Sequence, residues 1–169
     1  MLTISVEKIK SILGKSLLVD VSACLSSERS EGLNFVSPVR FVGSAKNEGD
    51  CIEISGELRG ELKIPCDRCG EMVQKEFETP FCEWYCLEGE KLDPKGEHDI
   101  YAFWGDTIDI SSQAAGAFFI ALPPQFLCGE DCLGLCAGCG ANLNTESCCC
   151  AEPEIDPRLA KLKEFVFED

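Results

Sequence analysis

The cysteines are the residues most able to do chemistry, and seven of the chain's 13 fall between positions 128 and 150. Thiolates at short spacing can bind a metal ion, form disulfides or exchange electrons. Two close pairs have the form C-x2-C-G, and the others have the forms C-x3-C and C-x-C. In chain order the four pairs are Cys66 and Cys69, Cys128 and Cys132, Cys136 and Cys139, and Cys148 and Cys150.

This spacing predicts two structural Zn²⁺ sites, because zinc prefers four thiolates at the corners of a tetrahedron. The glycine that follows each C-x2-C pair permits the positive φ that such a tight turn often needs. The local set C-x2-C-x8-C-x-C, from Cys136 to Cys150, can wrap one ion, with Cys149 able to replace either neighbour. The pairs that begin at Cys66 and Cys128 would share the second ion. A structural site of this type contributes on the order of 10 kcal/mol to folding.

Disulfide and redox roles for these cysteines are the less favoured alternatives. The N-terminal sequence has no basic head followed by an apolar run, so we expect no signal peptide and a reducing, cytoplasmic setting. Neither C-x2-C pair opens a helix in a βαβ unit, as a thioredoxin-type pair would. Four other cysteines are interpreted as small buried or half-buried residues, with the last two as a fallback metal pair. They are Cys24, Cys51, Cys82 and Cys86.

Charge is distributed unevenly along the chain, whose formal net charge is −15. Residues 66–169 hold seven Lys and Arg against 21 Asp and Glu, and neither Lys nor Arg occurs between Lys95 and Arg158. Binding to nucleic acid requires cations that displace counterions, so the cysteine-rich half is no conventional nucleic-acid-binding module. An acidic surface attracts basic partners instead, unless its acidity serves only solubility.

Strand patterns dominate the first half of the chain. The stretch CIEISGELRGELKI (51–64) alternates apolar and polar residues, which predicts a half-buried strand or a hairpin through Gly56 or Gly60. Weaker alternation predicts strands over 16–25, 39–46 and 72–81. Short polar connections favour an antiparallel sheet with one wet face.

Helices and a loop complete the predicted elements. A loop is expected over 86–99, and a helix near 110–122 that ends at Pro123 and packs Ala117, Phe118 and Ile120–Leu122 on the sheet. A second helix is expected over 153–169, where Asp156 and Pro157 suit its start. The fold class is therefore α+β: a twisted, β-rich antiparallel sheet with one or two packed helices and a C-terminal zinc-binding segment. The expected domains are 1–125, a zinc module over 126–152 packed on it, and the helix 153–169.

Other functional chemistry is sparse. His98 lies in a charged stretch, and no catalytic triad, phosphate-binding loop or dinucleotide fingerprint appears. Arg68, inside CDRCG, is either a surface charge or a contact for RNA or an acidic group. Trp84 and Tyr85 are interpreted as core residues rather than a stacking platform.

The runs CDRCG (66–70), ALPPQFLCGEDCLGLCAGCGANLN (121–144) and IDPRLAKLKEF (155–165) together resemble the cysteine-rich branch of the YceD-like family. That family is also called the large ribosomal RNA subunit accumulation protein family. The resemblance implies a bacterial or plastid factor needed for 23S rRNA accumulation, with genes beside that of the large-subunit protein bL32 and no assigned catalytic activity. Cys149, between the last two matching cysteines, departs from the family pattern.

Charge and resemblance together suggest a non-enzymatic ribosome-biogenesis factor that binds a basic large-subunit protein, with bL32 as the candidate, and contacts rRNA weakly or indirectly. One alternative is an RNA-binding zinc protein that uses the sheet face. Its cations would be Arg40, Lys46, Arg59, Lys63, Arg68 and Lys75. Another is a metal-dependent nuclease or a thiol oxidoreductase. Membrane and small-molecule partners are not expected.

Overall fold

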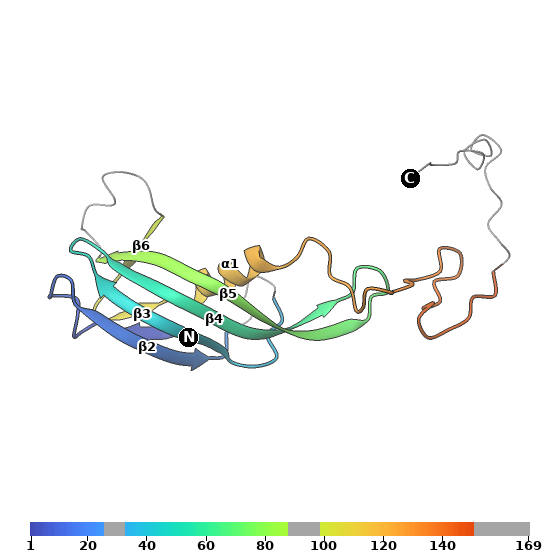
Figure 1. Ribbon diagram of the computed structural model, residues 1–169, viewed down its shortest axis with the longest axis horizontal. Coiled ribbons are helices and arrows are strands. Elements are labelled where there is room, and N and C mark those ends of the chain that lie inside the picture. The colour runs from blue at the N-terminus through green and yellow to red at the C-terminus, as the bar shows by residue number, and fades with distance from the viewer. Residues whose placement is uncertain (26–32, 88–98, 151–169) are drawn as a thin grey trace, which may run out of the picture.

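A computed structural model describes residues 1–25, 33–87 and 99–150 of the chain (Figure 1). Strands dominate the described residues, and one helix accompanies them. In chain order the elements are β1 (Thr3–Ser5), β2 (Ser16–Ala23), β3 (Val39–Asn47), β4 (Ile52–Pro65), β5 (Met72–Leu87), β6 (Ile100–Phe103), β7 (Thr107–Asp109) and α1 (Ser111–Ala121). The predicted α+β class is confirmed.

The main sheet has the strand order β2-β3-β4-β5-β6. Neighbouring strands are antiparallel from β2 to β5, as predicted, but β6 runs parallel to β5. A parallel neighbour needs a longer connection than a tight turn, and 12 residues separate Leu87 from Ile100 in the sequence. The sheet is therefore mixed at this edge rather than wholly antiparallel.

Strand β4 is one continuous strand and does not turn at Gly56 or Gly60. Its apolar residues Ile52, Ile54, Leu58 and Leu62 are buried in one row, as the alternation predicted. The register places Glu53, Glu57 and Arg59 in the opposite row, which faces away from the core. One face of the sheet is therefore exposed to solvent, and the other packs against the core.

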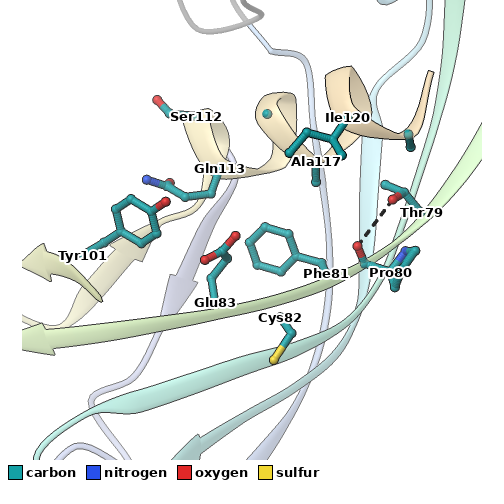
Figure 2. Close-up of a pocket in the computed structure, with 12 residues that line it drawn as sticks. Thr79, Pro80, Phe81, Cys82, Glu83, Tyr101, Ser112, Gln113, Ala117 and Ile120 are labelled. Atoms are coloured by element: carbon teal, nitrogen blue, oxygen red, sulfur yellow. Dashed lines mark hydrogen bonds between the residues drawn. The ribbon is translucent and has the colours of Figure 1, made fainter. Parts of the chain in front are cut away.

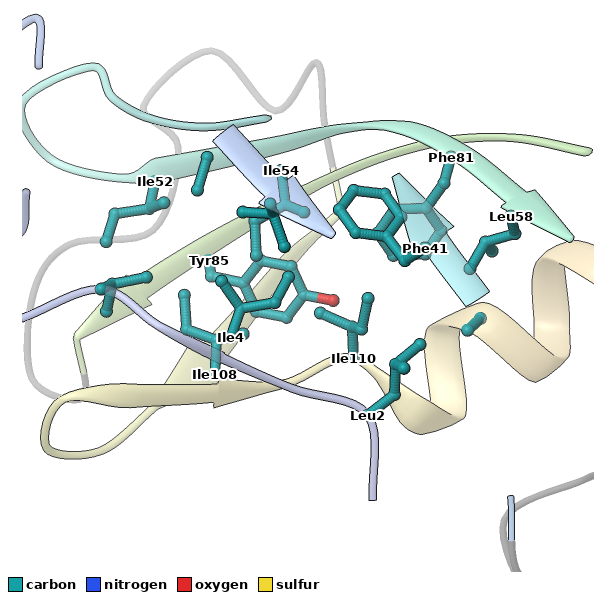
Figure 3. Packing of buried hydrophobic residues seen from close by; sticks show 14 of the residues in the cluster. Leu2, Ile4, Phe41, Ile52, Ile54, Leu58, Phe81, Tyr85, Ile108 and Ile110 are labelled. Atoms are coloured by element: carbon teal, nitrogen blue, oxygen red, sulfur yellow. The ribbon is translucent and has the colours of Figure 1, made fainter. Parts of the chain in front are cut away.

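The core lies between the sheet and the N-terminal segment (Figure 3). The sequence interpretation missed β1, which pairs with β7 in a small antiparallel sheet and places Ile4 opposite Ile108. Tyr85 is buried in this cluster, in agreement with its predicted core role. Buried Asn47 joins the segment before β2 to the sheet, because its Nδ2 donates to the carbonyls of Ile9 and Lys10 at 2.9 and 2.8 Å.

Helix α1 covers the core face beside β5. Asp109 Oδ1 accepts hydrogen bonds from the backbone N–H and the hydroxyl of Ser111, which fixes the first turn. Phe118 is buried as expected, but Ile120 is 85% exposed, so the prediction that it packs on the sheet is wrong. The apolar run around it is longer than the strip of the helix that faces the core.

Strands β4 and β5 continue past the rest of the sheet as a two-stranded ribbon. The pairing of β4 with β3 ends at Arg59, and its hydrogen bonds with residues 34–36 end at Lys63. From there β4 pairs with β5 alone, as far as Pro65 opposite Met72. The turn at residues 66–70 forms the tip of this ribbon (Figure 1). The chain after α1 returns to the same tip, so segments about 60 residues apart in sequence meet there.

The loop predicted over 86–99 begins too early, because Cys86 and Leu87 belong to β5. Residues 88–98 of that loop, which include His98, and the helix predicted over 153–169 lie outside the described residues. Over residues 1–25, 33–87 and 99–150, no helix has the length and apolar character needed to cross a membrane.

Candidate metal centre

All eight cysteines predicted as ligands gather in two groups, and in each group the four Sγ atoms lie within 4.8 Å of one another. Cluster 1 contains Cys66, Cys69, Cys128 and Cys132, and cluster 2 contains Cys136, Cys139, Cys148 and Cys150. These are the two groups of four that the spacing of the cysteines predicted. Cys149 is exposed and belongs to neither group.

The sulfur separations fit a tetrahedral ion. Four sulfurs at the Zn–S distance of about 2.3 Å form a tetrahedron with edges of about 3.8 Å. In cluster 1 the Cys66–Cys132 and Cys69–Cys128 separations are 3.8 and 3.6 Å. In cluster 2 Cys148 lies 3.8 Å from Cys139 and 3.1 Å from Cys136, the latter shorter than a tetrahedral edge.

The same backbone turn opens both clusters. The N–H of Gly70 donates to the carbonyl of Cys66 at 2.8 Å, and the N–H of Gly140 donates to that of Cys136 at the same distance. Both glycines have positive φ, 73° and 75°, which a side chain would disfavour. The predicted role of glycine after each C-x2-C pair is confirmed.

These turns aim backbone N–H groups at the first sulfur of each pair. Burial opposes ionisation of Cys66, but N–H groups of Cys69, Arg68 and Cys128 and the thiol of Cys69 outweigh it and lower its pKa to about 6. The N–H of Cys139, the thiol of Cys148 and the N–H of Gly138 lower the pKa of Cys136 to about 6 as well. Each turn therefore favours the thiolate, the form that binds metal.

Two hydrogen bonds between Asp67 and Phe126 hold the returning chain against the ribbon tip beside cluster 1. The N–H of Asp67 donates to the carbonyl of Phe126 at 2.8 Å, and Asp67 Oδ2 accepts from the N–H of Phe126 at 2.6 Å. The Phe126 ring packs against Phe77 of β5, with 6.1 Å between ring centroids, and Lys75 lies over it. The roles of Asp67 and Phe126 were not predicted. Their sequence signal is position, since Asp67 lies inside the Cys66–Cys69 pair and Phe126 lies two residues before Cys128.

Two asparagines that contact the clusters and their surroundings, Asn142 and Asn144, were also not predicted. Asn144 accepts from the N–H of Leu133 at 2.8 Å and places its Nδ2 3.5 Å from the Cys132 sulfur. Asn142 accepts from Asn144 and donates to Glu71 at 3.2 Å. The ANLN stretch after the second C-x2-C-G was the available signal. Such contacts orient ligands and tune a metal site.

The two clusters differ in their exposure. In cluster 1, Cys66, Cys69 and Cys132 are buried, with no more than 6% of their surface exposed, and Cys128 is exposed. In cluster 2, Cys139, Cys148 and Cys150 are exposed and Cys136 is half-buried. Cluster 1 therefore belongs to the folded body, whereas cluster 2 closes a surface loop.

Arg68 makes two hydrogen bonds within the protein. Its Nη1 donates to the carbonyl of Cys132 at 3.0 Å, and its own carbonyl accepts from the N–H of Leu135 at 3.2 Å. Both contacts tie the ribbon tip to the segment between the clusters. Nη1 therefore makes a structural contact, while a contact of the exposed Arg68 side chain with RNA or an acidic group stays a prediction.

Two of the remaining cysteines correct the sequence interpretation. Cys51 and Cys86 form a disulfide, although they were expected to be independent small residues. Because Ile52 pairs with Tyr85, the register brings their flanking cysteines together. The fallback metal pair of Cys82 and Cys86 is therefore wrong, and Cys24 and Cys82 are exposed.

The sheet-face cations are largely matched by carboxylates. Arg40 donates to both oxygens of Asp20 at 2.9 and 2.7 Å, which raises the pKa of the guanidinium. Arg59 lies between Glu57 and Glu78, at 3.0 and 3.2 Å. Lys46 pairs with Glu48 at 2.5 Å. Lys75 belongs to the other row of β5, so the six predicted cations do not line one face.

The fold and the cysteines define a small, strand-rich protein with a pair of tetracysteine clusters at one end. Residues 54–166 match the family model described as Large ribosomal RNA subunit accumulation protein YceD. The chain belongs to this family, as its motifs suggested. The description names a role in ribosomal RNA accumulation and no enzymatic reaction.

The relatives include an uncharacterized protein of Mycobacterium tuberculosis (strain ATCC 25618 / H37Rv), 32% identical over 67% of this chain and 55% of its own. The uncharacterized protein YlbN of Bacillus subtilis (strain 168) is 27% identical over 79% of this chain and 77% of its own. In Arabidopsis thaliana, the chloroplastic "Large ribosomal RNA subunit accumulation protein YCED homolog 1" is 26% identical over 62% of this chain and 41% of its own. The chain spans about half the length of the mycobacterial relative. No solved structure matches.

Proposed function

We propose that this protein is a non-enzymatic ribosome-biogenesis factor that supports accumulation of large-subunit rRNA by binding a basic large-subunit ribosomal protein. The family match and the charge around the clusters support this proposal. From residue 99 to residue 150 the chain has neither Lys nor Arg. Glu130, Asp131 and Glu146 lie exposed beside the clusters.

The clusters hold two structural Zn²⁺ ions in this proposal. Four thiolates suit zinc in both softness and geometry, and they fill its tetrahedron. The ion of cluster 1 would lock the ribbon tip to the returning chain. Eight thiolates and two Zn²⁺ would take the formal charge from −15 to about −19.

The acidic end would hold a cationic ribosomal protein until rRNA, with its higher charge density, competes for it. The bL32 protein remains the candidate partner, and the site of action would be wherever ribosomes assemble, the cytoplasm in a bacterium. An RNA-binding sheet face is less well supported, because carboxylates pair with Arg40, Arg59 and Lys46. Closed clusters would leave no open metal position for catalysis.

The test is a pull-down with the purified full-length chain in moderate salt. Purified basic large-subunit proteins, bL32 among them, are offered alone and with 23S rRNA as competitor. The proposal expects retention of at least one of these proteins, and its release as rRNA is added. Recovery of naked 23S rRNA without any ribosomal protein would refute it.

A further inference from the structure

A groove with a cavity volume of about 520 Å³ lies between α1 and β5 (Figure 2). Its walls are mainly apolar or neutral, from Phe81 on the strand to Ala117 and Ile120 on the helix. The groove runs along α1 and β5, whereas the cysteine clusters lie at and beyond the tip of the ribbon (Figure 1). Neither the family description nor the proposed zinc sites account for the groove.

One side of the groove is a sheet edge. Strand β6 pairs with β5 only over Trp84–Leu87, so β5 from Met72 to Glu83 has no strand on that side within the described residues. Such an edge presents backbone N–H and C=O groups to which an extended segment can add as a further strand. Pro80 lies in this stretch, and proline within sheets is characteristic of edge strands.

The groove contains a carboxylate in an unusual place. Glu83 occupies the inner row of β5, between Phe81 and Tyr85 and opposite the fully buried Ile54. Figure 2 shows Phe81 and Glu83 directed from β5 toward α1, whereas Cys82 points the other way. Of the residues that line the groove, Glu83 alone carries a formal charge.

This carboxylate is half-buried, and no described cation forms a salt bridge with it. Burial, and then the negative charge of Asp99, raise the pKa of Glu83. A partly desolvated carboxylate without a cation is costly, and a lysine or arginine that enters the groove would relieve that cost.

We propose that the groove binds an extended segment of a basic polypeptide, which adds as a strand to the edge of β5 and directs a lysine or arginine to Glu83. Side chains of a strand alternate, so the residues two before and two after that cation would face the same way. Apolar residues at those positions would contact Phe81 and Ala117. The choice of a basic partner rests on the proposed function, and the groove would be its docking site.

The test uses the full-length, zinc-loaded chain labelled with ¹⁵N and a peptide with both ends blocked, Val-Thr-Lys-Thr-Val. Amide shifts are expected along Thr79–Glu83 and Ser112–Ala121, and the same peptide with a central glutamate should bind at least tenfold more weakly. Shifts confined to other regions, or equal binding of the two peptides, would overturn the proposal.

Two variants place the site. A Cβ on Gly116 would meet no atom within 4 Å, so the side chain of Gly116→Leu can extend into the groove and fill it. Leucine also favours the helix more than glycine does. Binding of the lysine peptide should therefore be lost. Glu83→Gln should weaken it about tenfold, the value of one charge-assisted contact. Glu76→Gln, in the outer row of β5, should change it less than twofold. Unchanged binding by G116L, with its fold verified by thermal melting, would refute the groove site.

The same variants in the ribosomal-protein pull-down separate this inference from the proposed function. If wild-type protein retains a basic ribosomal protein and G116L and E83Q retain it equally, the groove proposal fails and the proposed function stands. If wild-type protein retains none, the proposed function fails, while the peptide shifts still decide whether the groove binds basic segments. A dimer that G116L converts to monomer would identify a second copy as the occupant and overturn the proposal.

Discussion

Asn47 shows how one polar side chain can fasten a segment that has little regular structure. Its amide donates to two carbonyls and its Oδ1 accepts from the N–H of Gly49 at 2.8 Å, all at a buried position. A buried polar group left without a partner costs about 1–3 kcal/mol. The hydrogen bonds of Asn47 therefore hold residues 9–10 against the end of β3.

Asn47→Leu should lower the free energy of unfolding by about 2–3 kcal/mol, because it leaves the carbonyl of Lys10 and the N–H of Gly49 without the Asn47 amide. The carbonyl of Ile9 keeps the N–H of Ile12 as a donor, at 3.0 Å. Chemical denaturation of the zinc-loaded chain measures the change. Asp50→Asn, an exposed polar change nearby, is the control and should have little effect. Equal stability of N47L and wild type would mean that this contact does not hold the segment.

Glu83→Gln should raise the melting temperature at neutral pH. Burial and Asp99 raise the pKa of Glu83, so its ionisation disfavours the folded state. That penalty is absent below the pKa of the unfolded chain, grows as pH rises from that value to the folded pKa, and is constant above it. The difference in melting temperature between variant and wild type should thus widen as pH rises from the unfolded pKa to the folded pKa and then level off, and a difference that is already constant in acid would contradict the role of ionisation.

At the scale of elements, two glycines allow the paired strands β3 and β4 to approach each other closely. Gly43 and Gly56 lie opposite each other in the inner row. A Cβ on Gly56 would lie 2.6 Å from the Gly43 Cα and 3.0 Å from the Phe41 ring, and would also clash with the Val42 carbonyl. The backbone must therefore shift to admit any side chain there.

Gly56→Ala should destabilise the fold by about 3 kcal/mol, the upper end of ordinary overpacking. The matched control is Gly116→Ala, a glycine of α1 whose added Cβ meets open space. That change should stabilise the protein by up to about 1 kcal/mol through helix propensity. The melting temperatures of the two variants should shift in opposite directions. An unchanged melting temperature for G56A would contradict the close approach of β3 and β4 at Gly43 and Gly56.

The two clusters should also differ in their effect on the sheet. Cys132→Ser removes a buried ligand of cluster 1. Asp67, inside the first cysteine pair of this cluster, is hydrogen-bonded to Phe126, so loss of the cluster should loosen the ribbon tip and lower the melting temperature of the whole chain by many degrees. Cys148→Ser disrupts the exposed cluster 2 and should leave the main transition within a few degrees of wild type. A larger loss from C148S than from C132S would reverse this hierarchy.

At the scale of the whole molecule, the alternation of a strand and the spacing of the cysteines predicted local structure correctly. Contacts that depend on how the strands pair were not predicted. Alternation over 51–64 predicted β4, and cysteine spacing predicted both groups of four. The Cys51–Cys86 disulfide depends on how β4 pairs with β5, which no local pattern encodes. Strand β1 has three residues and owes its form to pairing with β7.

The exposed Ile120 has a similar explanation. Hydropathy alone does not say which side of α1 faces the sheet, and a residue two positions from buried Phe118 lies on another side of the helix. The same limit hid the groove, because Glu83 and Gly116 are adjacent only after α1 packs beside β5. Long-range packing therefore determines the features that the sequence did not predict.

The most direct measurement is the metal content of the purified full-length chain, by elemental analysis together with a count of free thiols. Two zinc ions per chain are expected, falling to one in Cys132→Ser and to one in Cys148→Ser. A folded chain free of metal, with the cysteines of clusters 1 and 2 oxidised to one another, would contradict it.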